Sequence, residues 1–366
     1  MCLPNMLAEN NTNSILVKTS PSLALIKYWG KKNHGFNIPA TTSIAVTLEG
    51  LTTTTLVHKE GSERLVIKDD TQTSEQSLSE YMTLVRKYKK ISMHPDAHSI
   101  NSFPTAAGLA SSSSGFAALA LGISGLEKMH LYNTESVSIL LSNKKFSKEA
   151  SMLARLGSVS ASRSVYGGFT ILWQGACYAE QLADTSYWSD LRIMVAIVDK
   201  GEKSVSSRNG MRVTAQTSPY YKAWLNDAKK ISQEALLAFY AKDLEKLGTC
   251  MRASYLRMHA SAMASAEPIL YWLPESLTIL KIAERLRKEG FSIWETMDAG
   301  PQVKLIYPID EETALLKRFT ALLEACDKQL ADTVDLVLAK PGGKPEIALP
   351  DTAQFKEFVE KFHTNL

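Results

Sequence analysis

The sequence lacks the usual marks of a secreted, membrane or nucleic-acid-binding protein. Its four cysteines lie far apart and form no C-x-x-C pair, which argues against a zinc site or a disulfide framework. No stretch approaches the roughly 18 uninterrupted apolar residues that cross a bilayer, and residues 1–14 lack the pattern of a secretory signal. The formal net charge is only +3, so no cationic surplus suggests nucleic acid. We expect a cytoplasmic protein with reduced thiols and a flexible extension over residues 1–14.

The familiar nucleotide-binding motifs are also missing. No glycine is followed at the correct spacing by GK[ST], so there is no Walker A loop, and no G-x-G-x-x-G fingerprint of a dinucleotide fold occurs. An anionic ligand would therefore need a local site of another kind.

Size and composition favour a globular protein of two units. The 366 residues exceed the length at which a single core usually stops growing, and a weak shift in composition falls near residues 185–191. Hydrophobic residues make up 45% and charged residues 22%, as in ordinary soluble domains.

The local patterns predict an α+β fold. Runs rich in Val, Ile and Thr predict a strand at 14–20 and a hairpin at 43–58 that turns at Glu49-Gly50. Further strands are expected at 165–173, 192–198 and 303–307, and helices at 106–129, 146–156, 221–258 with a break, and 275–289. Because strands and helices do not alternate regularly, we favour α+β over a Rossmann-type fold.

The stretch FPTAAGLASSSSG at residues 103–115 concentrates small and hydroxyl residues just before and within a predicted helix. The start of a helix presents unpaired N–H groups and a positive dipole end, where phosphate binds readily. Gly108 would permit close backbone approach, and the serine hydroxyls could contact phosphate or Mg²⁺. A tightly packed helix would need small residues too, so both interpretations stay open on these residues alone.

Two further segments combine serine with arginine. GSVSASRSVYGGF, from Gly157, carries Ser158, Ser160 and Arg163, and the segment beginning at Lys203 adds Arg208. The planar fork of arginine suits bidentate phosphate recognition. Together with the stretch at 103–115, these segments indicate one polyanion site assembled from distant parts of the chain.

An aspartate and a basic loop complete the candidates. Asp298 stands before Ala-Gly-Pro after a strand-like segment, and the loop at 24–42 crowds Lys27, Tyr28, Lys31 and Lys32 together. In isolation the first is a turn residue and the second a solvated basic loop. An aspartate among such cations would have a depressed pKa, stay ionised and be able to orient or deprotonate a substrate hydroxyl.

These segments resemble the mevalonate diphosphate decarboxylase family of the small-molecule kinase superfamily that includes galactokinase, homoserine kinase, mevalonate kinase and phosphomevalonate kinase. The resemblance is carried, in order from about residue 15 to 340, by ALIKYWGKK, FPTAAGLASSSSG, GSVSASRSVYGGF, VSSRNGM, LRMHA and TMDAGPQVK. IKYWGK and MDAGP are typical of the decarboxylases rather than the kinases. AKPGGKPEI near residue 340 and the last twenty residues show no match.

The resemblance implies a fold and a reaction. The fold has an N-terminal lobe over 15–190, like domain 2 of ribosomal protein S5, that binds ATP and substrate. A ferredoxin-like lobe over 191–366 contributes the catalytic aspartate across a deep cleft. The implied reaction uses ATP and Mg²⁺ to convert mevalonate 5-diphosphate into isopentenyl diphosphate, ADP, phosphate and CO₂ by phosphorylating the 3-hydroxyl. A cytoplasmic homodimer in the mevalonate route of isoprenoid biosynthesis is expected, with no nucleic acid or membrane partner.

The resemblance also implies site residues. Asp298 and Lys27 would be catalytic. Substrate would be bound by Ala24, Tyr28, Lys31, Ser158, Ser160, Arg163, Arg208 and Met211. The nucleotide would be bound by Ala107, Gly108, Ala110, Ser111 and Ser112, with Ser111 or Ser112 near the Mg²⁺. His259 in LRMHA is interpreted as a structural histidine.

Three departures from the family pattern leave alternatives open. Ser22 and Gln302 stand where asparagines are usual, and P-A-T-T with Thr41 replaces P-x-N-S, at positions expected near the substrate. A phosphomevalonate decarboxylase acting on the monophosphate is one alternative, and a mevalonate 3-kinase is another. A third is an inactive relative that only binds metabolites, which the intact catalytic candidates disfavour.

Overall fold

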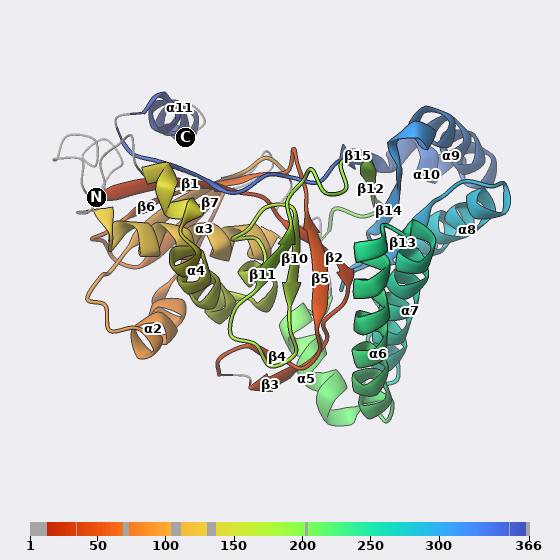
Figure 1. Ribbon diagram of the computed structural model, residues 1–366, viewed down its shortest axis with the longest axis horizontal. Helices are drawn as coiled ribbons and strands as arrows, with labels where there is room; N and C mark the ends of the chain where they lie inside the picture. Colours follow the sequence, from red (N-terminus) through yellow and green to blue (C-terminus); the bar gives the residue numbers. More distant parts are fainter. Residues whose placement is uncertain are drawn as a thin grey trace.

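The computed structural model describes residues 13–33, 35–68, 73–103, 111–129, 137–201, 204–350 and 352–363. Within these residues the chain builds three main sheets and one short two-stranded ribbon. Figure 1 shows both ends of the chain on one side of the molecule and the long helix pair α6 (Tyr221–Ala241) and α7 (Leu244–Met263) on the other.

The first sheet has the order β16-β1-β6-β9-β7-β8 and is antiparallel except for the β7–β9 pair. Its strands are β1 (Ser14–Thr19), β6 (Thr53–His58), β7 (Arg64–Lys68), β8 (Thr73–Ser77), β9 (Asp96–Asn101) and β16 (Glu346–Ala348). Helix α3 (Ser111–Leu126) covers one face so closely that a Cβ at Gly122 would lie 2.5 Å from Val57 and one at Gly125 2.6 Å from Ile15. Helix α4 (Lys144–Gly157) packs behind α3 in the same core.

Helix α11 (Ala353–His363) covers the other face of this sheet. Phe355, Phe358 and Phe362 pack there on Leu16 and Leu56. The last part of the chain thus returns to the sheet that holds its first strand.

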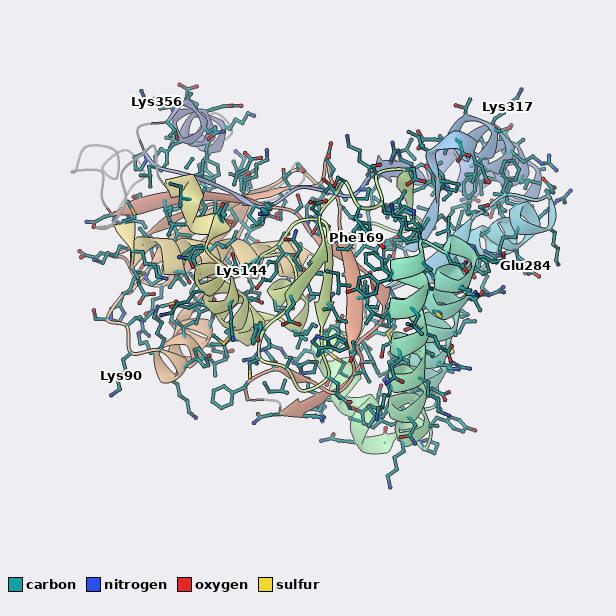
Figure 2. The ribbon with its side chains drawn as sticks, in the orientation of Figure 1. Lys90, Lys144, Phe169, Glu284, Lys317 and Lys356 are labelled. Carbon is teal, nitrogen blue, oxygen red and sulfur yellow. The ribbon has the colours of Figure 1, made fainter. Side chains whose placement is uncertain are left out.

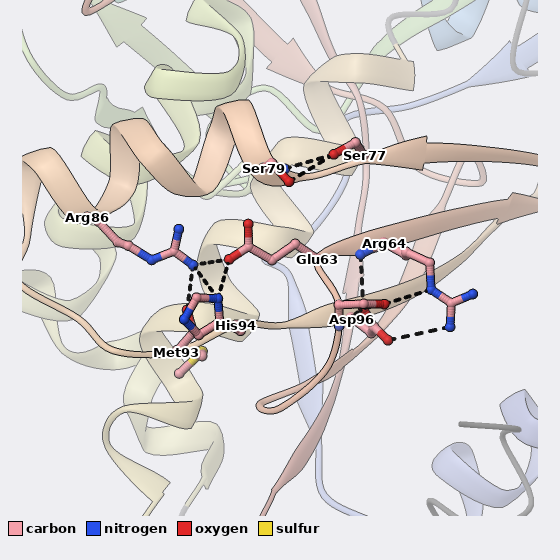
Figure 3. A network of polar contacts seen from close by, with 9 residues as sticks. Glu63, Arg64, Ser77, Ser79, Arg86, Met93, His94 and Asp96 are labelled. Carbon is pink, nitrogen blue, oxygen red and sulfur yellow. Dashed lines mark hydrogen bonds and ion pairs between the residues drawn. The ribbon is translucent and has the colours of Figure 1, made fainter.

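A polar network fastens helix α2 (Ser79–Tyr88) to the first sheet (Figure 3). Glu63 has a left-handed backbone, with φ 60°, and its carboxylate accepts from Arg86 of α2 and pairs with His94. The Asp96 carboxylate accepts the N–H of Arg64 at 2.9 Å. The turn before β7 is therefore held from two sides.

The second sheet, with the order β11-β10-β5-β2, occupies the middle of the molecule. Its strands are β2 (Ser22–Ile26), β5 (Ser43–Thr47), β10 (Phe169–Leu172) and β11 (Glu180–Ala183), and β3 (Lys31–Asn33) and β4 (Ile38–Pro39) form the ribbon beside it. Phe169, labelled in Figure 2, contacts Trp188 and also Phe239, which lies on α6. This sheet therefore packs directly on the helix pair.

The hairpin predicted at 43–58 is wrong. Both strands form, but β5 belongs to the second sheet and β6 to the first. The segment between them is held by distant residues, because the Glu49 N–H donates to the Lys340 carbonyl at 2.9 Å and Leu48 bridges to Pro341. A pairing partner almost 300 residues away leaves no local trace in the sequence.

The third sheet confirms the ferredoxin-like expectation. Its order is β13-β14-β12-β15, and all neighbours are antiparallel. In chain order, helices connect β12 to β13 and β14 to β15. The strands are β12 (Leu191–Ile197), β13 (Trp294–Met297), β14 (Val303–Pro308) and β15 (Asp335–Ala339). Between and beside them lie α5 (Ser207–Thr217), α6, α7, α8 (Pro274–Lys288), α9 (Glu312–Cys326) and α10 (Lys328–Thr333).

Most predicted elements form with shifted ends. The helical stretch at 221–258 breaks at Lys242, whose φ is 52°, and Asp243 then caps α7. Strand β10 begins only at Phe169 because residues 159–162 form a 3₁₀ turn and Gly168 has a φ of 70°. Three short 3₁₀ segments are described, namely η2 (Val137–Ser142), η3 (Val159–Ser162) and η4 (Ile309–Glu311). The described part of the chain contains no helix long and apolar enough to span a membrane.

Candidate active site

Asp298 and Lys27 follow strands of different sheets and form an ion pair. Lys27 directly follows β2 of the second sheet, and Asp298 directly follows β13 of the third. The Lys27 Nζ donates to Asp298 Oδ1 at 2.6 Å and to the Ala24 carbonyl at 2.6 Å. The Lys27 N–H donates to Ser254 Oγ of α7 at 2.9 Å, which fixes the main chain beneath the ion pair. The two predicted catalytic residues are therefore in direct contact.

Lys304 is a second cation on the same carboxylate, and sequence reasoning missed it. The hairpin β13–β14 places Thr296 opposite Lys304, so the turn between the strands brings Lys304 back beside Asp298. Its Nζ lies 3.3 Å from Asp298 Oδ2, and the side chain is only 3% exposed. The available signal was a lysine inside the apolar strand VKLIYP.

These charges keep Asp298 ionised. Burial opposes ionisation of the carboxyl, but Lys27 and Lys304 outweigh it and hold the pKa of Asp298 well below its usual range. Burial in turn lowers the pKa of Lys27, with contributions from Lys304 and Arg163, against the attraction of Asp298. A carboxylate held this way is a weak base, yet it is a strong acceptor for a hydroxyl and stabilises developing positive charge.

His259 of α7 lies behind this carboxylate. It is fully buried, its ring packs against Tyr255, Tyr271 and Trp272, and it faces the main chain of Asp298. Burial, followed by the charge of Lys27, lowers the pKa of His259 to about 3. The imidazole is therefore neutral at physiological pH.

Arg163 and Tyr28 lie next to the ion pair. Arg163 is 2% exposed, its Nη1 donates to Ser43 Oγ at 2.6 Å, and its guanidinium lies 5.9 Å from the centre of the Tyr28 ring. Burial raises the pKa of Tyr28 to about 12, so its hydroxyl is neutral and able to donate. Ser158 and Ser160, 3.1 Å apart through their hydroxyls, follow the end of α4 in the same segment.

Lys31 and Arg208 share a separate cavity of about 340 Å³. It is lined by Lys31, Asn37, Leu84, Leu156, Ser206, Arg208, Asn209 and Arg212. Burial, then the charge of Arg208, lowers the pKa of Lys31 to about 8. Among the described residues, neither Lys31 nor Arg208 forms an ion pair with a carboxylate. The cavity is therefore cationic and suited to an anion.

The serine run divides into two pairs along α3. Ser111 and Ser112, at the start of the helix, line a cavity of about 130 Å³ with a mostly apolar wall that includes Leu65 and Phe116. Ser113 and Ser114 are fully buried and bond to Ser22, Ser164 and Thr53. Ala107, Gly108 and Ala110 lie outside the described residues. Only the first pair is thus available to a ligand.

The remaining predicted binding residues are buried. Ala24 contributes the carbonyl that holds Lys27. Met211 is 3% exposed and packs in an apolar cluster with Trp29 and Trp224. Met211 therefore packs against the segment that contains Trp29.

Two family models match consecutive parts of the chain. Residues 19–183 match the diphosphomevalonate decarboxylase-like N-terminal domain, and residues 193–359 match the mevalonate 5-diphosphate decarboxylase C-terminal domain. The diphosphomevalonate decarboxylase of Danio rerio is 31% identical over 325 residues, covering 80% of this chain and 76% of the relative. The chain belongs to the diphosphomevalonate decarboxylase family. The second match also corrects an expectation, because the stretch from residue 340 to 359 lies inside the family domain.

Other relatives agree in sequence and fold. The diphosphomevalonate decarboxylase of Debaryomyces hansenii is 29% identical, and the match covers 92% of each chain. The crystal structure of mevalonate diphosphate decarboxylase from Staphylococcus aureus superimposes with a TM-score of 0.78 at 32% identity, covering 92% of this chain and 98% of that one. A structure described as MDDEF in complex with MVAPP, AMPPCP and magnesium gives a TM-score of 0.77 at 32% identity, covering 92% and 99%. The expected α+β fold of the family is thus confirmed.

The three departures from the decarboxylase pattern have structural partners. Gln302 accepts from the Val198 N–H at 2.7 Å and donates to the Asp199 carbonyl, which fixes the end of β12. Thr41 Oγ1 accepts the Trp29 N–H at 3.1 Å, and Ser22 Oγ lies 3.3 Å from Ser113 Oγ. Gln302, Thr41 and Ser22 thus each form a hydrogen bond that holds a neighbouring segment in place.

Magnesium has few protein donors here. Within the described residues, no group of three His, Cys, Asp or Glu side chains lies close enough to hold a metal ion. The hydroxyls of Ser111 and Ser112 at the start of α3 fit a Mg²⁺ that keeps most of its ligands as phosphate oxygens and water. The site therefore suits a metal that arrives with a nucleotide.

Proposed function

We propose that this chain catalyses the ATP- and Mg²⁺-dependent decarboxylation of mevalonate 5-diphosphate to isopentenyl diphosphate, ADP, phosphate and CO₂. The observation that carries the proposal is the ionised Asp298 held between Lys27 and Lys304. Support also comes from the relative solved with MVAPP, AMPPCP and magnesium, which is similar over 92% of this chain.

Asp298 would act on the 3-hydroxyl of the substrate. The carboxylate accepts a hydrogen bond from the hydroxyl and orients its oxygen toward the γ-phosphoryl group. As the new P–O bond forms, the hydroxyl proton passes to an oxygen of the transferred phosphate, so Asp298 stays ionised. Lys27 and Lys304 would screen negative charge during transfer.

The second half of the reaction needs a different property of the same carboxylate. The C3–O bond breaks with departure of phosphate, the C1–C2 bond breaks with release of CO₂, and the electrons of the latter form the C2=C3 double bond. Positive charge develops at C3 while phosphate leaves. An Asp298 that stays ionised stabilises that charge.

The diphosphate of the substrate would lie along the cations beside this centre. We assign it to Tyr28, Lys31, Ser160, Arg163 and Arg208, with Ser158 near the carboxylate or hydroxyl of the mevalonyl group and Ala24 and Met211 supporting the wall. Arginine binds phosphate bidentately, and paired cations without a carboxylate partner favour a highly charged ligand.

The nucleotide would bind at the start of α3. Its phosphates would meet the N-terminal end of the helix, where Ala107, Gly108 and Ala110 would contribute backbone groups and Ser111 and Ser112 their hydroxyls. The apolar cavity of about 130 Å³ beside Phe116 suits part of the nucleoside. Magnesium would neutralise phosphate charge at Ser111 or Ser112.

The test is a coupled ADP-release assay with ATP and Mg²⁺, run in parallel on mevalonate 5-diphosphate and mevalonate 5-phosphate while CO₂ is counted. Equal amounts of ADP and CO₂ on the diphosphate are expected. A preference for the monophosphate would instead make the chain a phosphomevalonate decarboxylase. ADP without CO₂ would make it a kinase, and absence of ADP with both substrates would contradict catalysis.

We further infer a division into an extension at 1–14, an N-terminal lobe at 15–190 and a C-terminal lobe at 191–366, with the substrate in a deep cleft between the lobes. The family matches, which change from one domain to the other between residues 183 and 193, support this division. A cytoplasmic homodimer is the proposed form of the enzyme. Light scattering on the purified chain, with a mass near twice the 40.4 kDa of one chain, tests the dimer.

A further inference from the structure

Asn37 holds Lys31 in an unusual way. It is 4% exposed and adopts a left-handed backbone conformation, with φ 52°, in the ribbon segment between β3 and β4. Its Oδ1 accepts from the Lys31 Nζ at 2.6 Å, while its Nδ2 donates to the Leu156 carbonyl at 2.7 Å. A buried amide thus ties a flexible ammonium group to the end of a helix.

The same helix end holds the second cation of the cavity. The Gly157 carbonyl, next to that of Leu156, accepts from Arg208 Nη2 at 3.2 Å. Carbonyls in the last turn of a helix carry partial negative charge, which favours nearby cations without neutralising them. Lys31, through Asn37, and Arg208 are therefore both oriented by the last turn of α4.

The cavity of Lys31 and Arg208 lies beside the reacting centre rather than within it, because neither Lys27 nor Asp298 is among its lining residues. The charge of Asp298 acts on Arg163 and Tyr28, and Arg208 also acts on Tyr28. Lys31 shares its cavity with Arg208, whose charge adds to the effect of burial on the ammonium group. A substrate whose hydroxyl meets Asp298 would thus present its inner phosphate to Arg163 and its terminal phosphate to Arg208 and Lys31.

We propose that Asn37 is a positioning residue that fixes the Lys31 ammonium at the terminal-phosphate end of this cavity and so sets the preference for a diphosphate over a monophosphate. This inference rests on the proposed function. A neutral amide suits the task, because it fixes the ammonium and leaves its charge for the substrate. A carboxylate at the same place would fix the ammonium but cancel its charge.

The first variant is Asn37→Gly. Glycine adopts positive φ readily, so this change keeps the backbone conformation and removes only the amide. The expected result is a rise of about tenfold in KM for mevalonate 5-diphosphate, in the range expected for losing a hydrogen bond to a charged group, with kcat at saturation within about twofold. KM for the monophosphate should change by less than about twofold, so the selectivity ratio of kcat/KM falls about tenfold.

Two further changes separate positioning from folding. Lys31→Met removes the ammonium group itself and should lower the ratio at least as much as Asn37→Gly. The double variant should lose little more than Lys31→Met, because Asn37 acts through Lys31. Lys32→Ala is the matched control, since this exposed neighbour has no part in the cavity and should leave the ratio unchanged. Thermal melts of each variant confirm that the compared proteins are folded.

The proposal is overturned if folded Asn37→Gly keeps the wild-type selectivity ratio, or if it lowers kcat equally for both substrates. Additive losses in the double variant would also overturn it. Failure of the proposed function would look different, because the wild-type protein itself would then release no CO₂ with the diphosphate.

Discussion

Two groups of cations in this molecule are built in opposite ways. Lys27 and Lys304 are buried, 2% and 3% exposed, and both contact the Asp298 carboxylate. Lys31 and Arg208 line a cavity, and within the described part of the chain their side chains donate to neutral oxygens, those of Asn37 and of the Gly157 carbonyl. The first group shares a carboxylate of the protein, whereas the second has no carboxylate partner among the described residues.

The difference separates chemistry from binding. A carboxylate already held by two cations needs no rearrangement to accept a hydroxyl or to stabilise positive charge, so its contribution belongs to the transition state. Cations that lack a counter-charge gain one when an anionic substrate arrives, so their contribution belongs to binding. Changes to the first group should lower kcat, whereas changes to the second should raise KM.

The largest effect is expected from Asp298→Asn. The variant keeps the shape of the side chain but loses its negative charge, and kcat should fall about 10²- to 10³-fold, as when a group that stabilises the transition state is removed. Steady-state kinetics at saturating ATP measure this fall. Asp310→Asn, at an exposed position in η4, is the matched control and should have wild-type kcat. An Asp298→Asn enzyme that keeps more than half of the normal kcat would contradict the catalytic role of Asp298.

The next prediction concerns His259, the buried histidine behind Asp298, and the pH dependence of stability. His259 has a pKa of about 3 in the folded protein against 6.5 for an ordinary histidine, so protons bind preferentially to the unfolded chain between these values. Its stabilising contribution is complete above pH 6.5 and is lost as the pH falls. From pH 7 to pH 5 this one group should cost about 2 kcal/mol of unfolding free energy. Urea unfolding of the wild type and of His259→Gln at both pH values should show a smaller pH dependence in the variant, and equal dependence would refute a buried neutral imidazole.

Lys304→Met tests the cation that the sequence did not reveal. Removing one of the two charges on Asp298 should raise the pKa of that carboxyl and lower kcat about tenfold, corresponding to one hydrogen bond between charged groups. Because Lys304 is in the paired group, KM for the diphosphate should stay within about twofold. A large rise in KM with normal kcat would place Lys304 with the binding cations instead.

The smallest effect is a shift in pH dependence at the second group. Lys31 loses its proton as the pH rises through about 8, so kcat/KM for the diphosphate should decline above that pH. Burial and then the charge of Arg208 lower the pKa of Lys31. Arg208→Gln removes the second cause and should move this decline to higher pH by up to about one unit, even as kcat/KM falls overall. Profiles of kcat/KM between pH 6 and 10 measure the shift. An unmoved decline would mean that another group titrates.

The sequence predicted the central contact of the candidate site better than it predicted the sheets around it. The motifs at Lys27 and Asp298 identified a pair that is in contact at 2.6 Å, although they lie in different sheets. Lys304 was missed because its approach to Asp298 depends on the register of the β13–β14 hairpin, which only the folded pairing defines. Asn37 was missed because an asparagine in a loop gives no sign of a bond to a carbonyl 119 positions away.

Helices were predicted more accurately than strand pairings, again because local contacts can be read from the sequence and distant ones cannot. The helices α6 and α7 could be predicted from periodicity because helical contacts are local. A break within 221–258 was expected, and the structure places it at Lys242. The hairpin at 43–58 failed because strand partners are chosen by the whole fold, and here residues 340 and 341 hold the segment that separates β5 from β6. The division of the four serines into a cavity pair and a buried pair needed the start of α3 at Ser111.

The most direct measurement is the dissociation constant of mevalonate 5-diphosphate, by calorimetry without nucleotide, for the wild type, Asp298→Asn and Arg208→Gln. The account predicts that Asp298→Asn binds within about twofold of the wild type, or more tightly since a negative charge is gone, and that Arg208→Gln binds about tenfold more weakly, as expected for a lost charge-assisted contact. Weakened binding in Asp298→Asn together with unchanged binding in Arg208→Gln would contradict the separation of a catalytic from a binding group of cations.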